Sequence, residues 1–531
     1  MTMSEARFGA GHRDAAQQEA PPQDAPGHGD PPRSRAYAAL DGILSGGLAL
    51  GLATLFAGVM GWVGFAGGTP SPVPAVGGAF VDRTPSWLKD FAIATFGTHD
   101  KLALFVGMGV VLVGVCAAIG LLSRTRQTLA LALLVLVGAV GAAAVLTREG
   151  AAAQDIVPTV LGTLLGVRTL RRLRQSAEQL DGNLTRRRML AGGGAVVAAL
   201  LGSRLSGGSG AAATARAEVA LPAAGPAPSI ESASVDVPGV SPYVVPNAGF
   251  YRIDTALVVP HLDTATWSVK VTGEVEREVT LDWATLLTKP MQQALVTLTC
   301  VSNEVGGDLI GNAVWTGWPV RELLAMAGPR AGADMVLSRS SDGFTAGTPI
   351  EALTDDRNAL LAIGMNGQPL PFEHGFPVRL VVPGLYGYVS ATKWLTELKV
   401  TRFSADQGYW TPRGWSAKGP IKTASRIDVP RLGARVKAGT VAVAGVAWAP
   451  HRGVRTVEVQ VDQEPWQIAR LAGEPTTDSW RQWVYEWPAT TGQHSLTVRA
   501  TDGAGAVQSS QEAPPAPDGS SGYHRVDVTV E

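Results

Sequence analysis

The most informative segment of this chain is Thr297-Leu-Thr-Cys300-Val-Ser-Asn303-Glu-Val-Gly-Gly-Asp-Leu-Ile-Gly-Asn312-Ala-Val-Trp315-Thr-Gly-Trp318. An apolar, β-branched run ends at Cys300, and a loop rich in Gly, Asn and Ser follows it. This pattern predicts a strand that delivers a thiol to a loop, where functional residues concentrate. A buried free cysteine is the commoner use of the residue. The segment alone therefore leaves both a metal ligand and a packing residue open.

Composition limits the classes of protein to consider. The 531 residues suffice for several domains, and 44 basic residues nearly balance 45 acidic ones, which gives no case for binding nucleic acid. The second cysteine, Cys116, lies within an apolar run and is most simply a small packing residue. Two cysteines exclude a Cys-ligated iron–sulfur cluster and a Cys-x-x-Cys-His haem site within this chain. Any redox cofactor bound by this chain would therefore need one thiolate at most.

The amino-terminal part is predicted to be a membrane region. Residues 1–35 are polar and are typical of a disordered cytoplasmic tail. Residues 36–205 hold apolar runs on the scale of a bilayer crossing, from which we expect about five transmembrane helices. The runs are 36–68, 102–122, 128–146, 156–167 and 189–205, of which the fourth is the shortest.

Basic residues indicate the orientation of these helices. The groups are Arg33 and Arg35, Arg124 and Arg126, and the cluster 168–188. All three groups fall on the cytoplasmic side only if there are five spans. The sequence thus predicts a multi-pass protein of the cell membrane, with everything after residue 206 outside the cytoplasm.

The fifth run follows Leu184-Thr-Arg186-Arg187-Arg188-Met-Leu190, which resembles a twin-arginine export signal, a route for folded, cofactor-loaded proteins. An ordinary basic flank of a membrane helix accounts for it equally well. The predicted spans contain no histidine and almost no charge, which disfavours a haem carrier and a transporter. An anchor or docking surface is the simpler prediction.

The remainder of the chain is predicted to be globular after a flexible linker. Residues 206–240 are rich in Gly, Ala, Ser and Pro. Short β-type runs then alternate with helical stretches over residues 241–424, which indicates an α+β domain. Recurrent short strands with turn residues between them predict an all-β immunoglobulin-like sandwich over residues 425–531. The predicted fold class is therefore multi-domain: an all-α transmembrane bundle, an α+β domain and an all-β sandwich.

Three separated blocks give the α+β domain a resemblance to a known family. They are Asn247-Ala-Gly-Phe250-Tyr251, the Cys300 segment, and Met365-Asn-Gly-Gln-Pro-Leu-Pro-Phe-Glu-His374-Gly-Phe-Pro-Val-Arg379 continuing to Tyr386-Gly-Tyr-Val-Ser390-Ala-Thr392-Lys393-Trp394. In this order they resemble the sulfite oxidase superfamily of molybdopterin-dependent oxidoreductases. The resemblance implies molybdenum and molybdopterin as cofactors, with Cys300 as metal ligand and catalytic residue. The sandwich resembles the family's dimerisation domain, which implies a homodimer.

The same resemblance implies a set of cofactor-binding residues: Asn247, Phe250, Tyr251, Cys300, Val301, Asn303, His374, Arg379, Ser390, Thr392 and Lys393. An arginine fork and a lysine charge suit the terminal phosphate of the pterin. Without the family pattern, Arg379 and Lys393 would be interpreted as surface charges and His374 as a structural turn residue. Whether the pterin carries an added nucleotide stays open.

Departures from the family pattern bear on the substrate. Ile363 stands where sulfite oxidases carry a substrate-facing tyrosine, and Val301-Ser-Asn303-Glu304 replaces an Ala-Gly-Asn-Arg-type run. Arg252 is the nearest candidate for the catalytic arginine that binds an anionic substrate. Fewer cationic donors weaken the case for a sulfite-like dianion and leave a sulfoxide as an alternative.

The sequence therefore predicts a membrane-anchored molybdenum oxidoreductase of the sulfite oxidase type, acting on a small extracytoplasmic substrate that is sulfite-like or sulfoxide-like. Its expected partners are the lipid bilayer and an external electron donor or acceptor protein. The competing hypothesis is a non-catalytic, membrane-anchored binding or adhesion module with a degenerate cofactor fold. Retention of Cys300 and of the block from His374 to Lys393 favours the enzyme.

Overall fold

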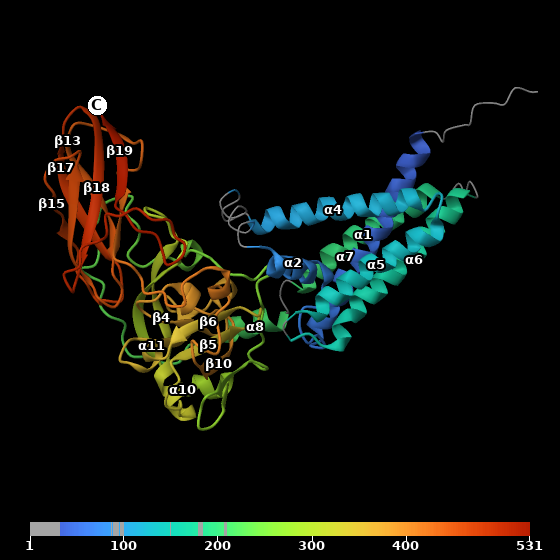
Figure 1. Ribbon diagram of the computed structural model, residues 1–531, viewed down its shortest axis with the longest axis horizontal. Helices are drawn as coiled ribbons and strands as arrows, with labels where there is room; N and C mark the ends of the chain where they lie inside the picture. The colour runs from blue at the N-terminus through green and yellow to red at the C-terminus, as the bar shows by residue number, and fades with distance from the viewer. Residues whose placement is uncertain are drawn as a thin grey trace, which may run out of the picture.

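The computed structural model describes residues 32–85, 88, 95, 100–148, 150–178, 184–206 and 210–531. A helical region, a central α+β domain and a C-terminal β-rich domain follow one another along the chain (Figure 1). Most of the predicted tail, residues 1–35, lies outside the described residues, and the first helix already begins at Pro32.

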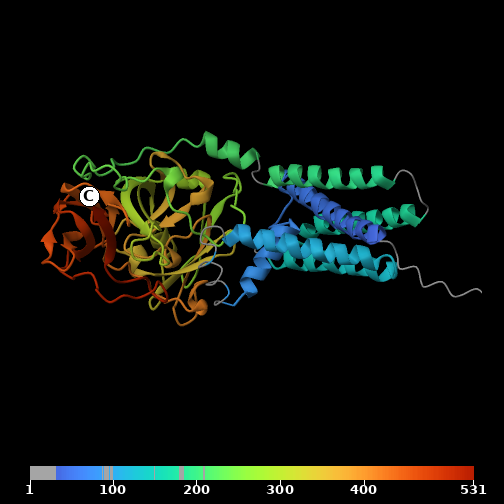
Figure 2. The ribbon, with the colours of Figure 1, turned by 90° about the horizontal axis from the view of Figure 1, so that it is seen from above.

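The helical region consists of long helices that lie side by side (Figure 2). Its described helices are α1 (Pro32–Trp62), α2 (Pro72–Arg83), α4 (Asp100–Leu122), α5 (Gln127–Leu146), the short η2 (Ala153–Ile156), α6 (Val157–Glu178) and α7 (Leu184–Ser206). Within the described residues, three helices are long and apolar enough to cross a membrane, over Arg35–Trp62, Lys101–Leu122 and Gln127–Leu146. The other two predicted spans form α6 and α7, which carry arginines and are not among these three helices.

Small residues bring these helices into close contact. A Cβ atom on Gly42 of α1 would overlap the backbone of α4 at Cys116, and one on Gly162 of α6 would overlap the backbone of α1 at Ala49. Cys116 itself is 3% exposed and packs against Gly46, in agreement with a small packing residue. Close approach through glycine and alanine is the way helices associate when large apolar side chains face outward.

The arginine cluster before the fifth predicted span has a partner within the helical region. Arg188 donates from Nε and Nη2 to the two carboxylate oxygens of Asp41, at 2.6 and 2.9 Å, and its guanidinium lies over the ring of Tyr37. Asp41 is 1% exposed, so this two-pronged ion pair joins the start of α7 to α1. Arg188 thus has a structural role, and the export signal stays a prediction.

The structure differs from the flexible linker predicted for residues 206–240. Residues Gly210–Glu218 form helix α8, whose alanine-rich sequence has high helix propensity. Arg216 of α8 donates to the carbonyls of Leu370 and Pro369 at 2.7 and 2.9 Å. Further on, Val235 is buried against the C-terminal domain. Composition alone indicated flexibility because it carries no information on the surfaces that this segment contacts.

The central α+β domain contains two sheets. The first has the order β2-β1-β10-β5-β6, in which β1 and β10 are parallel, and the second has the antiparallel order β3-β4-β7-β8 with β9 paired to β7. The strands are β1 (Ser268–Gly273), β2 (Val279–Asp282), β3 (Gln292–Thr299), β4 (Ile310–Pro319), β5 (Met335–Ser340), β6 (Thr345–Pro349), β7 (Leu360–Met365), β8 (Gln368–Pro369), β9 (Arg379–Val381) and β10 (Leu395–Thr401). The helices are α9 (Trp283–Leu287), α10 (Val320–Ala327) and α11 (Glu351–Thr354), and short 3-10 turns η3 (Asn247–Gly249), η4 (Phe372–His374), η5 (Gly387–Val389) and η6 (Thr411–Arg413) complete it.

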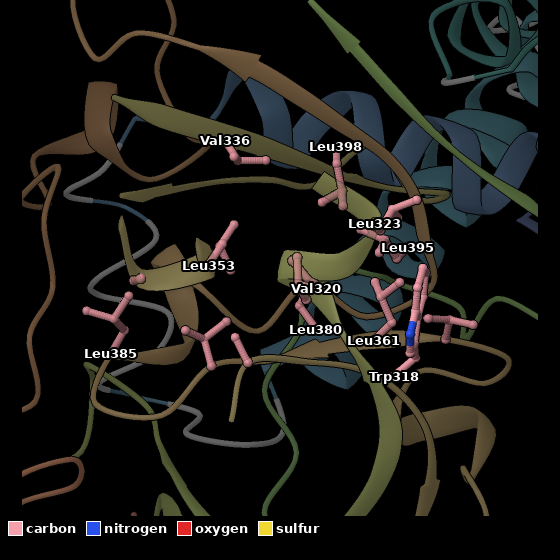
Figure 3. Packing of buried hydrophobic residues seen from close by; sticks show 14 of the residues in the cluster. Trp318, Val320, Leu323, Val336, Leu353, Leu361, Leu380, Leu385, Leu395 and Leu398 are labelled. Carbon is pink, nitrogen blue, oxygen red and sulfur yellow. The ribbon is translucent and has the colours of Figure 1, made fainter. Parts of the chain in front are cut away.

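A large apolar core joins the two sheets and the helix α10. Figure 3 shows side chains from α10, β7 and β10 converging, among them Leu323, Leu361 and Leu398. All three are fully buried. This core fixes the ends of β3 and β9, the two strands that carry the candidate functional residues.

The C-terminal domain consists of two facing sheets. Their orders are β11-β13-β17-β16 and β12-β19-β18-β14-β15. The strands are β11 (Ala424–Val429), β12 (Arg435–Val436), β13 (Gly439–Trp448), β14 (Val454–Val461), β15 (Gln467–Ile468), β16 (Arg470–Leu471), β17 (Arg481–Ala489), β18 (Gly492–Asp502) and β19 (His524–Val530). Trp483 of one sheet and Val457 of the other belong to one buried core, which makes the domain a β-sandwich.

Candidate functional site

Cys300 lies directly after β3, at the start of a loop that returns to β4. The backbone N–H of Cys300 donates to Leu309 at 2.9 Å, and Asn303 accepts from the N–H of Leu309 through Oδ1 at 2.8 Å. Cys300 is 8% exposed, and burial raises the pKa of its thiol. A cation bound at the sulfur would reverse that effect and hold the thiolate. The loop therefore presents one thiol in a fixed backbone frame.

The C-terminal domain holds the far side of this loop. Ser520 donates from its hydroxyl to the carbonyl of Asn303 at 2.6 Å, and Arg426 donates to the carbonyl of Gly307 at 2.7 Å. A Cβ atom at Gly306 would overlap the ring of His524, and its φ of +80° also favours glycine. Sequence analysis did not find these contacts because they join segments more than a hundred residues apart.

The segment before β1 contributes an aromatic cluster to the site. Phe250 stacks on Tyr251, with ring centroids 5.2 Å apart, and meets the rings of Trp315 and His374 edge-on at 5.8 and 5.6 Å. Burial raises the pKa of Tyr251 far above its usual value, Cys300 raises it further, and Arg379 opposes the shift. Tyr251 therefore shares one electrostatic environment with the thiol and the guanidinium.

Arg379 is a buried cation whose partners are backbone carbonyls. It is 5% exposed and donates to the carbonyls of His374 at 3.2 Å and Ala391 at 3.4 Å, and it lies 5.0 Å from the centre of the Trp315 ring. Burial lowers its pKa to about 10, so it remains charged at neutral pH. Within the described part of the chain it forms no ion pair. A buried guanidinium with long bonds to neutral acceptors is suited to an anionic group.

Lys393 lies beside Arg379 and forms part of a cluster around Asp254. Its ammonium donates to Asp254 Oδ2 at 2.7 Å and to the carbonyl of Glu373 at 3.0 Å. Arg252 donates to the same oxygen at 2.9 Å, and Lys101 of α4 donates to Oδ1 at 2.6 Å. Burial lowers the pKa of Lys393 to about 8, although Asp254 raises it.

The structure thus places Arg252 in this cluster, with a carboxylate already bound to it. Asp254 is 3% exposed; burial alone would raise the pKa of its carboxyl, but Lys393 and Lys101 hold it well below the usual range. Neither Asp254 nor Lys101 was found by sequence analysis. Asp254 follows the Asn247–Tyr251 block closely, and this proximity was the only signal available.

His374 is a buried histidine at the end of η4. Its Nε2 lies 3.0 Å from the carbonyl of Asn247, which can only accept, so Nε2 carries the proton. Burial lowers the pKa of His374 to about 4, and the charge of Arg379 lowers it further. The amide oxygen of Asn247 accepts from Asn366 at 2.8 Å. His374 and Asn247 therefore fix the block before β1 against the β7–β9 region.

The remaining predicted residues have partners inside the protein. Ser390 donates to the carbonyl of Tyr386 at 2.9 Å, and the hydroxyl of Thr392 is 2.7 Å from that of Ser338. The side chain of Val301 belongs to the apolar core, and Asn303 closes the Cys300 loop. These four side chains support the site's framework, and their internal contacts distinguish them from the weakly bonded Arg379.

A small cavity lies between the Cys300 loop and the C-terminal domain. Its volume is ≈ 20 Å³, about the space of one water molecule, and Thr299, Tyr386 and Ser520 are among its lining residues. Thr299 is 1% exposed, and its hydroxyl has no hydrogen-bond partner among the residues that the structure describes. Burial raises the pKa of Tyr386 to about 12, and the charge of Cys300 adds to this effect.

The residues present fit a molybdenum–pterin group. One buried thiol suits the metal, and a buried guanidinium without a carboxylate partner suits a phosphate. No group of three or more His, Cys, Asp and Glu side chains that could bind a metal occurs in the ranges that the structure describes. A metal at Cys300 would accordingly need most of its ligands from an organic cofactor.

Comparisons with known proteins agree with this chemistry. The family model of the oxidoreductase molybdopterin binding domain matches residues 256–410. Human mitochondrial sulfite oxidase is 31% identical over 323 residues, which cover 51% of this chain and 58% of the human protein. The uncharacterized oxidoreductase YuiH of Bacillus subtilis (strain 168) is 31% identical over 162 residues, or 30% of this chain and 78% of YuiH. This chain therefore spans somewhat over half the length of the human relative.

Among solved structures, the sulfane dehydrogenase SoxCD from Paracoccus pantotrophus aligns with a TM-score of 0.48 at 22% identity. The alignment covers 55% of this chain and 84% of that chain.

Proposed function

The chain belongs to the sulfite oxidase superfamily of molybdopterin-dependent oxidoreductases, and we propose that it is a membrane-anchored enzyme whose Cys300 thiolate binds molybdenum. The observation that carries this proposal is the common environment of Cys300, Tyr251 and Arg379. In this environment, a single buried thiol lies near a buried guanidinium that forms no ion pair with any of the described residues.

Each part of the site has a proposed task. Cys300 ligates the metal, and Arg379 and Lys393 hold the terminal phosphate of the pterin by charge-assisted hydrogen bonds. The Phe250–Tyr251 stack would line the space for the pterin and limit the access of water. Protonated Nε2 of His374 fixes the segment that carries this stack. When bound, the cofactor supplies the two-electron redox chemistry.

The proposed reaction is oxygen-atom transfer coupled to two electrons. Oxidation of a sulfite-like substrate adds one oxygen from water and releases two protons and two electrons to an external electron-carrier protein. Reduction of a sulfoxide takes two electrons from such a carrier, takes up two protons and releases water. The buried Tyr386 hydroxyl and the cavity beside Thr299 lie near the thiol and offer a place for a water molecule.

A neutral sulfoxide fits this chain better than a sulfite-like dianion. The guanidinium of Arg252, the candidate for binding an anionic substrate, already binds Asp254 at 2.9 Å. Ile363 is fully buried in the apolar core and contributes no polar donor. Substrate discrimination by charge needs a free cationic donor, so we propose a sulfoxide-like substrate, with sulfite as the competing one.

The test combines cofactor analysis with turnover. The full chain, purified in detergent from a host that loads molybdoenzymes, should contain molybdenum and pterin near one per chain. It should reduce methionine sulfoxide with a reduced dye faster than it oxidises sulfite. Cys300→Ser should abolish turnover, by about a thousandfold or more, while pterin stays bound. A folded parent without molybdenum and pterin refutes the enzyme and leaves the non-catalytic binding module.

We also propose five membrane spans with the site outside the cytoplasm. Large apolar side chains are exposed on α7, including Met189 and Leu190 at 71% and 66%, and on α6, including Leu164 at 58%. Such faces suit lipid contact even though arginines occupy the helix ends. Alkaline phosphatase fused to the C-terminus should be active, whereas a fusion after Glu178 should be inactive. The reverse pattern would refute the orientation.

The C-terminal sandwich is proposed to be immunoglobulin-like and to support a homodimer. Its two facing sheets and shared core support the first part of this proposal, and the family resemblance supports the second. Sedimentation of the detergent-solubilised chain distinguishes the monomer from the dimer. A monomer at all accessible concentrations would remove the dimer from this account.

A further inference from the structure

The function proposed so far gives no role to one contact between the helical region and the candidate anion site, which consists of Arg379 and Lys393. Lys101, in the first turn of α4, donates to Asp254 Oδ1 at 2.6 Å and to the carbonyl of Ala256 at 2.7 Å. Asp254 is the carboxylate that also binds Lys393 and Arg252, at 2.7 and 2.9 Å. One buried carboxylate therefore links a helix of the predicted membrane anchor to the lysine of the phosphate site.

The number of cations around Asp254 exceeds what one carboxylate can neutralise. Lys101, Arg252 and Lys393 all bind it, and the nearby charge of Arg379 lowers the pKa of Lys393. Lys101 and Arg252 are partly exposed to water, but Lys393 and Arg379 are 9% and 5% exposed. Positive charge on these two buried side chains is unfavourable unless an anion joins it. A phosphate that carries two negative charges would supply that anion and accept hydrogen bonds from both Lys393 and Arg379.

Lys101 affects how strongly Asp254 competes with such a phosphate for the ammonium group of Lys393. While Lys101 occupies Oδ1, the attraction of the carboxylate for Lys393 is partly neutralised. Without Lys101, the full negative charge of Asp254 acts on Lys393 and repels an incoming anion. Coulomb interactions at these distances are substantial because Asp254 is only 3% exposed.

An apolar contact places the helical region independently of this ion pair. A Cβ atom on Gly77 of α2 would lie 2.9 Å from a methyl of Leu257 and 3.5 Å from the sulfur of Met108 on α4. Helix α2 thus packs through apolar atoms against the segment that carries Asp254, and α4 packs against α2. Removal of the Lys101 charge should therefore leave the docking of α4 largely intact.

We propose that Lys101 is a positioning residue of the anion site, through which the helical region strengthens binding of the pterin phosphate by neutralising Asp254. This inference rests on the proposed function, because it assumes that molybdopterin binds at Arg379 and Lys393. By linkage, the coupling is reciprocal, so bound cofactor also strengthens the attachment of α4 to the α+β domain.

The test measures the rate at which pterin dissociates from the full chain in detergent, at fixed pH and salt. Lys101→Met should lose pterin at least fivefold faster than the parent. Lys101→Arg, which keeps the charge, should behave like the parent. Lys270→Met, which removes an exposed lysine from β1, is the matched control and should also leave the rate unchanged.

The double variant Lys101→Met/Asp254→Asn separates neutralisation of Asp254 from a general structural role. Removing the carboxylate as well should restore slow dissociation, because nothing then competes for Lys393. A parental rate in Lys101→Met, or no recovery in the double variant, overturns the inference while the proposed function stands. A folded parent without pterin overturns the proposed function and this inference together.

Discussion

At the Cys300 end of the candidate site, short hydrogen bonds from the loop and the C-terminal domain hold the loop backbone. At the Arg379 end, three cations bind the one carboxylate of Asp254, and Arg379 itself donates to backbone carbonyls. Asn303, Ser520 and Arg426 make bonds of 2.6–2.8 Å around the loop. The bonds of Arg379 to carbonyls are 3.2–3.4 Å long. The loop at the first end is held by short bonds within the protein, whereas the second end has more cations than carboxylates.

Because of this difference, we expect the two ends of the site to depend on the cofactor in different ways. A loop with satisfied hydrogen bonds can present the thiol before anything binds, which is the preorganisation that metal ligation requires. The two buried cations at the other end, Arg379 and Lys393, gain most of their stabilisation when an anion arrives. Substitutions at the Cys300 end should therefore act on stability or turnover, and substitutions at the Arg379 end on retention of the cofactor.

The largest effect is expected at Arg379. Arg379→Gln removes the buried charge, and purified protein should retain at least tenfold less pterin than the parent, since charge-assisted hydrogen bonds contribute about 1.5–3 kcal/mol each. Arg277→Gln is the matched control, because Arg277 also donates to a carbonyl but is distant in sequence from the site's blocks. Pterin measured by fluorescence after oxidation decides the result. Parental pterin content in Arg379→Gln would place the phosphate elsewhere.

The second-largest effect is expected at Arg426, a residue of the C-terminal domain that contacts the Cys300 loop. Arg426→Gln breaks a buried pair with Asp428, whose side chains are 9% and 7% exposed, and should lower the free energy of unfolding by about 3 kcal/mol. Arg435→Gln removes an exposed pair in the same domain and should cost less than about 0.5 kcal/mol. Denaturant unfolding followed by tryptophan fluorescence measures both. Equal losses of unfolding free energy in the two variants would show that Arg426 and its contact with the loop contribute no more to stability than an exposed ion pair.

The third effect concerns pH and His374. Its pKa in the folded protein, about 4, lies below the usual 6.5, so the unfolded chain binds the proton first as the pH falls. Stability due to this residue is fully present above pH 6.5 and decreases as the pH falls towards 4, by about 3 kcal/mol in total. His374→Gln keeps a donor for Asn247 and should lack this decrease. The same pH slope in parent and variant would contradict a buried neutral histidine.

The smallest effect is expected at Thr299, whose buried hydroxyl has no hydrogen-bond partner within the described part of the chain. Thr299→Val removes the hydroxyl at nearly constant volume, and the cofactor-free protein should be equally stable or gain up to about 1 kcal/mol. Thermal unfolding of parent and variant measures the difference. A loss of more than about 1 kcal/mol would mean that an ordered water in the adjoining cavity binds Thr299.

The comparison also separates what the sequence could predict from what it could not. The position of Cys300 after a strand, the α+β organisation and the following β-rich domain were all accessible, because each depends on local patterns of apolar and turn residues. The Lys101–Asp254–Lys393 cluster was not, since it joins residues 139 to 153 positions apart. The contact of Thr392 with Ser338 was not accessible either, because a sequence motif does not reveal such internal partners; the roles of Ser390 and Thr392 at the cofactor stay predictions.

The central claim is that the Cys300 thiolate binds molybdenum held by a pterin. X-ray absorption at the molybdenum edge, on the parent and on Cys300→Ser with pterin and metal assayed in both, tests it most directly. The account predicts one fewer sulfur neighbour per bound molybdenum in the variant, with pterin still present because Arg379 and Lys393 are unchanged. An identical number of sulfur neighbours in the two proteins would contradict it.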